Sequence, residues 1–167
     1  MNRTTVGGPE LGGGRGAGGV LVLVDPTGAG DSPVAGLLAQ ELHPSVHLRT
    51  DDFLRVIRNG RIPPHLPEAE RQNATALAAT AQAAFAYATR GYQVVVECPA
   101  TPPTLATFRR ESRATGAALH YVILTTTPPA PDAPTTRHTF DTSDLTPETT
   151  AKSLLTVLTT RTHLLGW

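Results

Sequence analysis

The chain has 167 residues, of which 40% are hydrophobic and 17% are charged, and its formal net charge is zero. This length and composition suit one compact domain with a buried core. The balanced charge argues against a nucleic-acid-binding surface, and no apolar stretch approaches the roughly 20 residues of a membrane span. The single cysteine excludes an internal disulfide framework and fits the cytoplasm.

Apolar runs alternate with longer helical patterns along most of the chain. In chain order, the predicted elements are a strand at 19–25, a helix at 32–42, a strand at 45–50, a helix at 67–91, a strand at 92–98, a helix at 103–116, a strand at 118–125, a short strand at 138–143 and a helix at 146–161. This alternation predicts an α/β fold with a mostly parallel sheet of about five strands between two layers of helices.

Two segments have no such periodicity. Residues 1–18 are rich in glycine and lack the apolar region of a secretory signal, so we expect a flexible tail followed by a single domain at 19–167. Residues 126–136 are rich in proline, which predicts a loop or a flap.

Acidic residues follow several of the predicted strands. Asp25 ends the first strand, and Asp51 and Asp52 follow the second. Glu97 and Cys98 end the third strand. Because ligands of parallel α/β sheets bind at the carboxyl ends of the strands, we expect these side chains to line one site. Paired carboxylates in a crevice can serve as general acid and general base.

Residues 25–32 read DPTGAGDS and lie between the first strand and the first helix. A phosphate-binding loop of the form G-x-x-x-x-G-K-[ST] occupies this place in many nucleotide-binding proteins. Gly28, Gly30 and Ser32 fall where that loop has small residues and a hydroxyl group. The segment therefore has the frame of a phosphate loop.

Two carboxylates weaken this loop as a phosphate site. Asp25 replaces the first glycine of the pattern and Asp31 replaces its lysine, while the single lysine of the chain is Lys152. Two unit charges about 4 Å apart interact by roughly 4 kcal/mol at an effective dielectric constant of about 20, so repulsion in place of attraction costs a polyphosphate about a thousandfold or more in affinity. Three roles are open for Asp31: a helix cap, a catalytic or substrate-orienting carboxylate, or part of a retained nucleotide site.

Several segments resemble the small P-loop kinases related to chloramphenicol phosphotransferase and to bacterial AAA-type ATP-binding kinases. They are the loop at 25–32, TDDFLRVIRNGRIPP at 50–64, and the segments at 72–97, 119–125 and 140–151. The resemblance implies a P-loop kinase-like three-layer sandwich. It also implies that Asp51 or Asp52 acts as a base toward the substrate and that Glu97 serves magnesium or the substrate.

The sequence departs from that family in two places. The P-loop lysine is absent, and the arginine-bearing lid between the fourth and fifth strands is replaced by the proline-rich stretch, with Arg137 at its end. Phosphoryl transfer depends on positive charge around the transferring group. We therefore expect a repurposed kinase scaffold, without ATP or another cofactor, that acts on a small organic metabolite in bacterial specialised metabolism. Carboxylate acid–base chemistry of the isomerase, cyclase or lyase type is the expected reaction; the alternatives are a residual ATP-dependent phosphotransferase and a non-catalytic pseudokinase.

The candidate residues fall into two groups. The predicted catalytic residues are Asp31, Asp51, Asp52 and Glu97. The predicted substrate-binding residues are Asp25, Gly28, Gly30, Ser32, Phe53, Arg55, Arg58 and Cys98. No metal site is expected, because the histidines lack metal-ligand spacing. The expected partner is a small molecule, not nucleic acid or a membrane, and a homodimer is left open.

Some of these residues have alternative roles that the sequence does not decide. Glu97 could pair with a structural arginine, Arg49 or Arg55. Cys98 could be a small buried filler in place of a nucleophile. The arginines of the LRVIRNGR segment could form a solvated face or a clamp for an acidic substrate; they are Arg55, Arg58 and Arg61.

Overall fold

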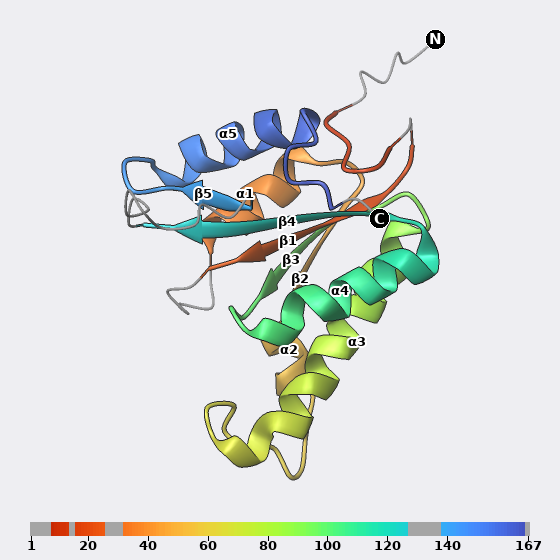
Figure 1. Cartoon of the computed structure of the whole chain (residues 1–167), viewed down its shortest axis with the longest axis vertical. Coiled ribbons are helices and arrows are strands. Elements are labelled where there is room, and N and C mark those ends of the chain that lie inside the picture. Colours follow the sequence, from red (N-terminus) through yellow and green to blue (C-terminus); the bar gives the residue numbers. More distant parts are fainter. Residues whose placement is uncertain (1–7, 14–15, 26–31, 127–137, 166–167) are drawn as a thin grey trace.

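The computed structural model describes residues 8–13, 16–25, 32–126 and 138–165 (Figure 1). A five-stranded sheet has the order β2-β3-β1-β4-β5, and every pairing in it is parallel. The strands are β1 Gly19–Val24, β2 Ser45–Arg49, β3 Gln93–Cys98, β4 Ala118–Thr125 and β5 Thr139–Asp141. The predicted α/β fold is confirmed, and the carboxyl ends of all these strands lie at one edge of the sheet.

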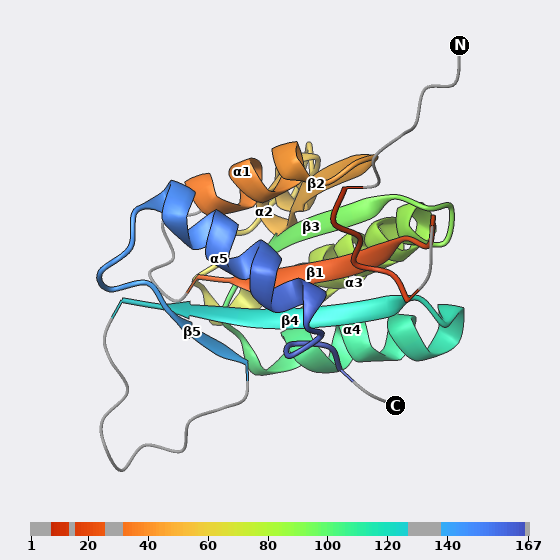
Figure 2. The same ribbon diagram turned by 90° about the horizontal axis from the view of Figure 1, so that it is seen from above.

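Helices cover both faces of the sheet (Figure 1 and Figure 2). They are α1 Pro33–Glu41, α2 Thr50–Arg55, α3 Glu70–Ala88 with a preceding 3₁₀ turn at Pro67–Ala69, α4 Pro102–Thr115 and α5 Pro147–Thr159. Helices α1 and α5 pack together on one face, and α3 and α4 pack together on the other. The three-layer sandwich is as predicted, whereas α2 was not predicted.

The central strand β1 is buried along its whole length. Its valines lie in one core cluster with Phe85 and Phe108 of α3 and α4. Leu21 and Leu23 lie in the second cluster, with residues of α1 and α5. A strand covered on both faces must be apolar at every position, which explains why the sequence shows a continuous apolar run there.

The described part of the segment before β1 is packed against the sheet. Leu11 is 2% exposed. Its N–H donates to Gln93 Oε1 at 2.7 Å, and its carbonyl oxygen accepts from His120 Nε2 at 2.8 Å. Burial lowers the pKa of His120 and outweighs the effect of this hydrogen bond, which raises it. The expectation of a flexible tail over residues 1–18 is therefore wrong around Leu11.

Glycines allow the close approach of this segment to the start of β1. A Cβ on Gly19 would lie 2.7 Å from Leu11 Cβ, and a Cβ on Gly18 would lie 2.1 Å from the carbonyl oxygen of Ala88. Real Cβ atoms do not approach other heavy atoms so closely. The glycine-rich composition that suggested flexibility thus reflects tight packing at these two positions.

The proline-rich stretch at 126–136 lies outside the described residues, except for Thr126. None of the described helices combines the length and the apolar character that crossing a membrane requires.

Leu11→Ala tests the docking of the N-terminal segment. The change removes a buried side chain, so we expect the free energy of unfolding to fall by about 2–5 kcal/mol. Urea denaturation followed by circular dichroism measures the loss. Val56→Ala is the control, because Val56 is 67% exposed. An unchanged denaturation midpoint for Leu11→Ala would contradict the packing described.

Candidate functional site

A cavity of about 830 Å³ lies at the carboxyl ends of β1, β2 and β3. Its apolar walls include Leu54, Pro64, Leu66, Leu77 and Pro99. Its charged side chains are Asp25, Arg49, Asp51, Glu70 and Glu97. The cavity occupies the place that parallel α/β sheets give to their ligands, and it collects acidic residues from separate strand ends as the sequence predicted.

Glu97 lies at the end of β3, between β1 and β2. Its Oε1 accepts a hydrogen bond from the N–H of Ser32 at 2.8 Å. Its Oε2 accepts from His47 Nε2 at 2.7 Å and lies 3.7 Å from Arg49 Nε. Both carboxylate oxygens therefore have partners. Of the two arginines that the sequence offered for pairing, Glu97 lies beside Arg49.

The backbone N–H groups at the start of α1 are the groups that would contact a phosphate in a phosphate loop. Phosphate loops bind anions through backbone N–H groups at the start of the following helix. Here Ser32 is the N-cap residue and Pro33 the first helical residue. The N–H of Ser32 is donated to Glu97, and proline has no N–H. Of the described residues at this helix start, Ser32 therefore has its N–H already hydrogen-bonded within the chain, and Pro33 has none to donate. Gly28, Gly30 and Asp31 lie outside the described residues.

Asp51 and Asp52 of α2 are neighbours that face different surroundings. Asp51 Oδ2 lies 2.7 Å from Arg55 Nη2, and Asp52 Oδ1 lies 3.6 Å from Arg55 Nη1. Asp51 lines the cavity, whereas Asp52 is not among its lining residues. Successive residues of a helix point in directions about 100° apart, which separates the two carboxylates. Asp51 is thus the one placed to meet a ligand.

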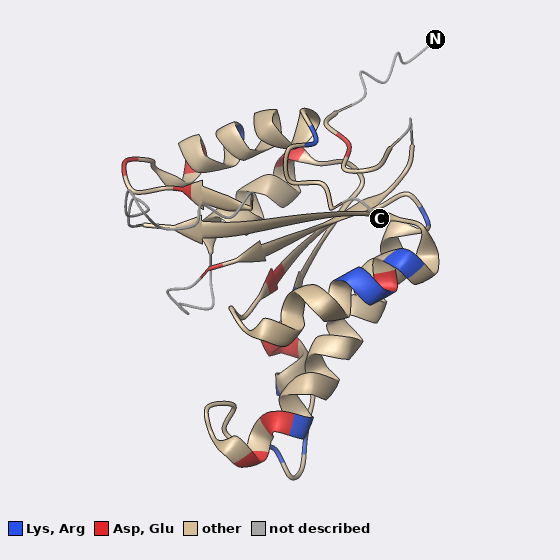
Figure 3. Cartoon of the chain, viewed as in Figure 1, with Lys and Arg blue, Asp and Glu red and all other residues tan. Residues whose placement is uncertain are grey.

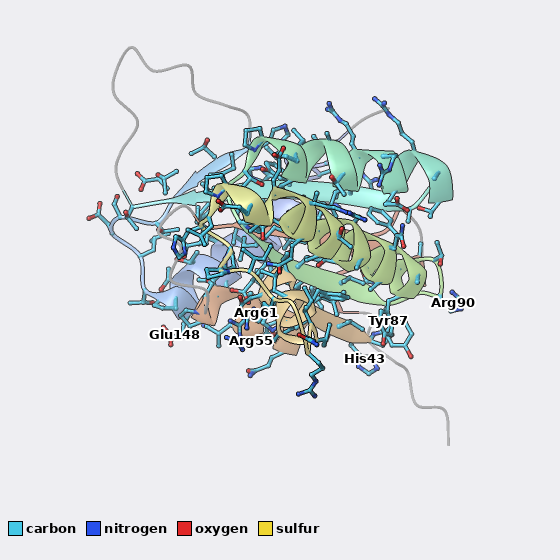
Figure 4. The ribbon with its side chains drawn as sticks, turned by 90° about the horizontal axis from the view of Figure 1, so that it is seen from below. His43, Arg55, Arg61, Tyr87, Arg90 and Glu148 are labelled. Carbon is cyan, nitrogen blue, oxygen red and sulfur yellow. The ribbon has the colours of Figure 1, made fainter. Side chains whose placement is uncertain are left out.

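The other predicted ligand contacts on this segment lie away from the cavity. Arg55, Arg58 and Arg61 are exposed and absent from its lining, and Figure 4 shows Arg55 and Arg61 at the molecular surface. Phe53 is half-buried but does not line the cavity either. Of the two roles considered, the solvated face fits these arginines.

Cys98 lines the cavity but is poorly suited to act as a nucleophile. Its side chain is 7% exposed. Burial raises the pKa of the thiol to about 12, against a hydrogen bond from Thr50 that lowers it, and the charge of Glu97 raises it further. The thiolate is the nucleophilic form, so this environment fits the alternative role of a buried filler.

Sequence reasoning missed several lining residues contributed by the segment around the start of α3. His65, Glu70 and Asn73 all face the cavity. The spacing of Glu70, Asn73, Ala74 and Leu77 places them on one face of α3, and this periodicity is the signal that could have found them. Within the described ranges, no group of three or more His, Cys, Asp or Glu side chains is arranged to hold a metal ion.

Alkylation of the single cysteine tests the environment of Cys98. At pH 8 we expect iodoacetamide to label the folded protein slower than the urea-unfolded protein by about a thousandfold or more, because the thiolate is far rarer at the raised pKa. Mass spectrometry of quenched samples measures both rates. Similar rates in the two states would contradict the buried, protonated thiol.

No protein-family model matches the sequence, and no curated protein matches it significantly. Solved structures are similar in fold. An APS kinase from Mycobacterium tuberculosis matches with a TM-score of 0.64 and 19% identity, over 85% of this chain and 97% of that chain. The tunicamycin resistance protein of Deinococcus radiodurans matches with a TM-score of 0.59 and 12% identity, over 84% of this chain and 95% of that chain.

A hexameric APS kinase from Thiobacillus denitrificans matches with a TM-score of 0.60 and 18% identity, over 90% of this chain but 31% of that chain. Identities this low are informative about the fold alone. Together with the strand order and the helices on both faces, these comparisons show that the chain has a P-loop kinase-like fold.

Proposed function

We propose that this chain is a repurposed P-loop kinase scaffold that acts on a small organic metabolite by carboxylate acid–base chemistry, without ATP. The observation that carries the proposal is the hydrogen bond from the N–H of Ser32 to Glu97. In a phosphate loop an N–H at this position can contact the anion, and here the chain's own carboxylate accepts its hydrogen bond. The cavity beside it is nevertheless large enough for a small organic ligand.

Charge at the loop supports the loss of nucleotide binding. Asp25 and Asp31 stand where the phosphate loop has a glycine and a lysine, and Glu97 adds a third carboxylate at the start of α1. Phosphoryl transfer requires compensation of the negative charge on the transferring group. Added negative charge would repel a polyphosphate, so a reaction without a phosphoryl donor suits this site better.

Asp51 and Asp25 are the residues to which we assign the chemistry. Both line the cavity, and they come from different elements, Asp51 from α2 and Asp25 from the end of β1. The ion pair with Arg55 orients the Asp51 carboxylate. In the proposed reaction one residue, as the carboxylate, removes a proton from the substrate, and the other, as the carboxylic acid protonated from solvent, donates a proton elsewhere on it, so that each ends in the form in which the other began. Such a transfer serves isomerisation, cyclisation or elimination, and the apolar walls limit competing water.

Exchange with deuterated water tests the proposal across many candidate substrates at once. The protein is incubated in D₂O with a library of small metabolites, and with neither nucleotide nor Mg²⁺, and products are followed by mass spectrometry. We expect deuterium to enter a carbon position of at least one compound, because the returned proton comes from solvent. Asp51→Asn should lower that rate by about a hundredfold or more.

Asp52→Asn is the matched control, since Asp52 contacts the same arginine but lies outside the cavity lining. We expect it to retain the exchange activity. A phosphorylated product formed only with Mg-ATP would contradict the proposal in favour of a residual phosphotransferase. A compound that binds but never exchanges, with equal affinity for wild type and Asp51→Asn, would instead indicate a non-catalytic binding protein.

A further inference from the structure

A buried histidine of β4 holds the segment that precedes β1. His120 is 1% exposed, and its Nε2 lies 2.8 Å from the carbonyl oxygen of Leu11. The N–H of Leu11 donates to Gln93 Oε1 at 2.7 Å. Two polar side chains of the sheet thus hold the backbone of this segment, whose described residues 8–13 and 16–18 we call the N-terminal strap.

The partner of His120 determines which ring nitrogen carries the hydrogen. A carbonyl oxygen only accepts hydrogen bonds, so Nε2 of the neutral ring is the donor and Nδ1 is the unprotonated nitrogen. Within the described part of the structure, His120 Nδ1 is buried and has no hydrogen-bond partner. Protonation would turn Nδ1 into a buried donor without an acceptor and would add a buried charge, and both changes cost free energy.

The positive charges near His120 also oppose its protonation. Burial lowers the pKa of His120 most, against the hydrogen bond to Leu11, which raises it, and the charges of Arg161 and His163 lower it further. Arg161 and His163 come from the segment that follows α5, and Figure 3 shows a basic position at the end of α5 and an acidic position on the strap. The ring is therefore neutral while the strap is docked.

The other elements around His120 are apolar or already paired. No carboxylate of the described residues is among the groups that shift the pKa of His120. Its partner in the neighbouring strand β1 is Leu21, and apolar residues of α1 and α5 cover this face of the sheet. Glu10, the one carboxylate of the strap, accepts from the N–H of Gly16. A proton on His120 would therefore find no counter-charge in the docked arrangement.

We propose that the N-terminal strap is released by acid: it is docked while His120 is neutral and leaves the sheet when the ring binds a proton. Release removes Leu11 from the ring and admits water, which can solvate the charge and accept from Nδ1. The released state binds the proton more tightly, so docking is strongest above the ordinary histidine pKa of about 6.5 and weakens as the pH falls below it. The inference goes beyond the proposed function, because the strap lies at the amino end of β1 and the cavity lies at the carboxyl ends of the strands.

Amide hydrogen exchange of the wild-type protein, followed by NMR between about pH 7.5 and pH 5, tests the inference. The readout is the protection factor of the Leu11 N–H, in which the intrinsic pH dependence of exchange is divided out. We expect it to fall by up to about tenfold per pH unit below about pH 6.5, as one bound proton requires. Val22, buried in the middle of β1, should keep its protection. A constant protection factor at Leu11, or equal losses at Leu11 and Val22, would overturn the inference.

His120→Gln and His65→Gln form a matched pair of variants. Glutamine can donate an amide N–H to Leu11 as His120 does, but it does not bind a proton. We expect His120→Gln to remove the pH dependence at Leu11. His65→Gln should keep it, since His65 is exposed and lies before α3. A pH dependence that persists in His120→Gln, or one that is lost in His65→Gln, would contradict the role of His120.

The ring nitrogens of the wild-type protein give a readout that does not depend on a variant. Nitrogen-15 shifts of His120 should show the hydrogen on Nε2 at neutral pH, and the ring should become protonated over the pH range in which Leu11 loses protection. A ring that is protonated while Leu11 stays protected would overturn the inference even if His120→Gln failed to dock the strap.

Discussion

The site depends on the hydrogen bond from the N–H of Ser32 to Glu97, which joins the end of β3 to the start of α1. In a phosphate loop such an N–H is free to meet an anion, and here the anion belongs to the chain itself. A carboxylate that is 14% exposed is costly to bury without partners. His47 and Arg49 of β2 supply further donors and positive charge, so three elements meet at one side chain.

This arrangement explains how one part of a kinase scaffold can change while the rest persists. The core around β1 is built from apolar contacts with the four helices α1, α3, α4 and α5. Helices α2 and α3 line a large cavity, to which they contribute the carboxylates of Asp51 and Glu70. Because function resides in sites and not in the fold, our proposal assigns the chemistry of this cavity to Asp25 and Asp51, which both line it.

The sequence predicted whatever depended on local pattern, and it missed what depended on distant contacts. The strands followed from their apolar runs, and helix α5 begins at Pro147, within one residue of its predicted start. Helix α2 is six residues long and polar at its start, too short for a periodic signal. No local pattern could separate Asp51 from Asp52, or place Leu11 against Gln93, because those outcomes are decided by segments far along the chain.

The central claim is that the phosphate site is closed. Calorimetric titration of Mg-ATP into the wild-type protein tests it most directly, since nucleotide binding can be measured whatever the substrate is. The account predicts no measurable heat of binding at millimolar nucleotide, because the N–H of Ser32 is donated to Glu97 and the loop sequence carries Asp25 and Asp31 in place of a glycine and a lysine. Binding with micromolar affinity would contradict the account and would show that an acidic phosphate loop still accepts a nucleotide.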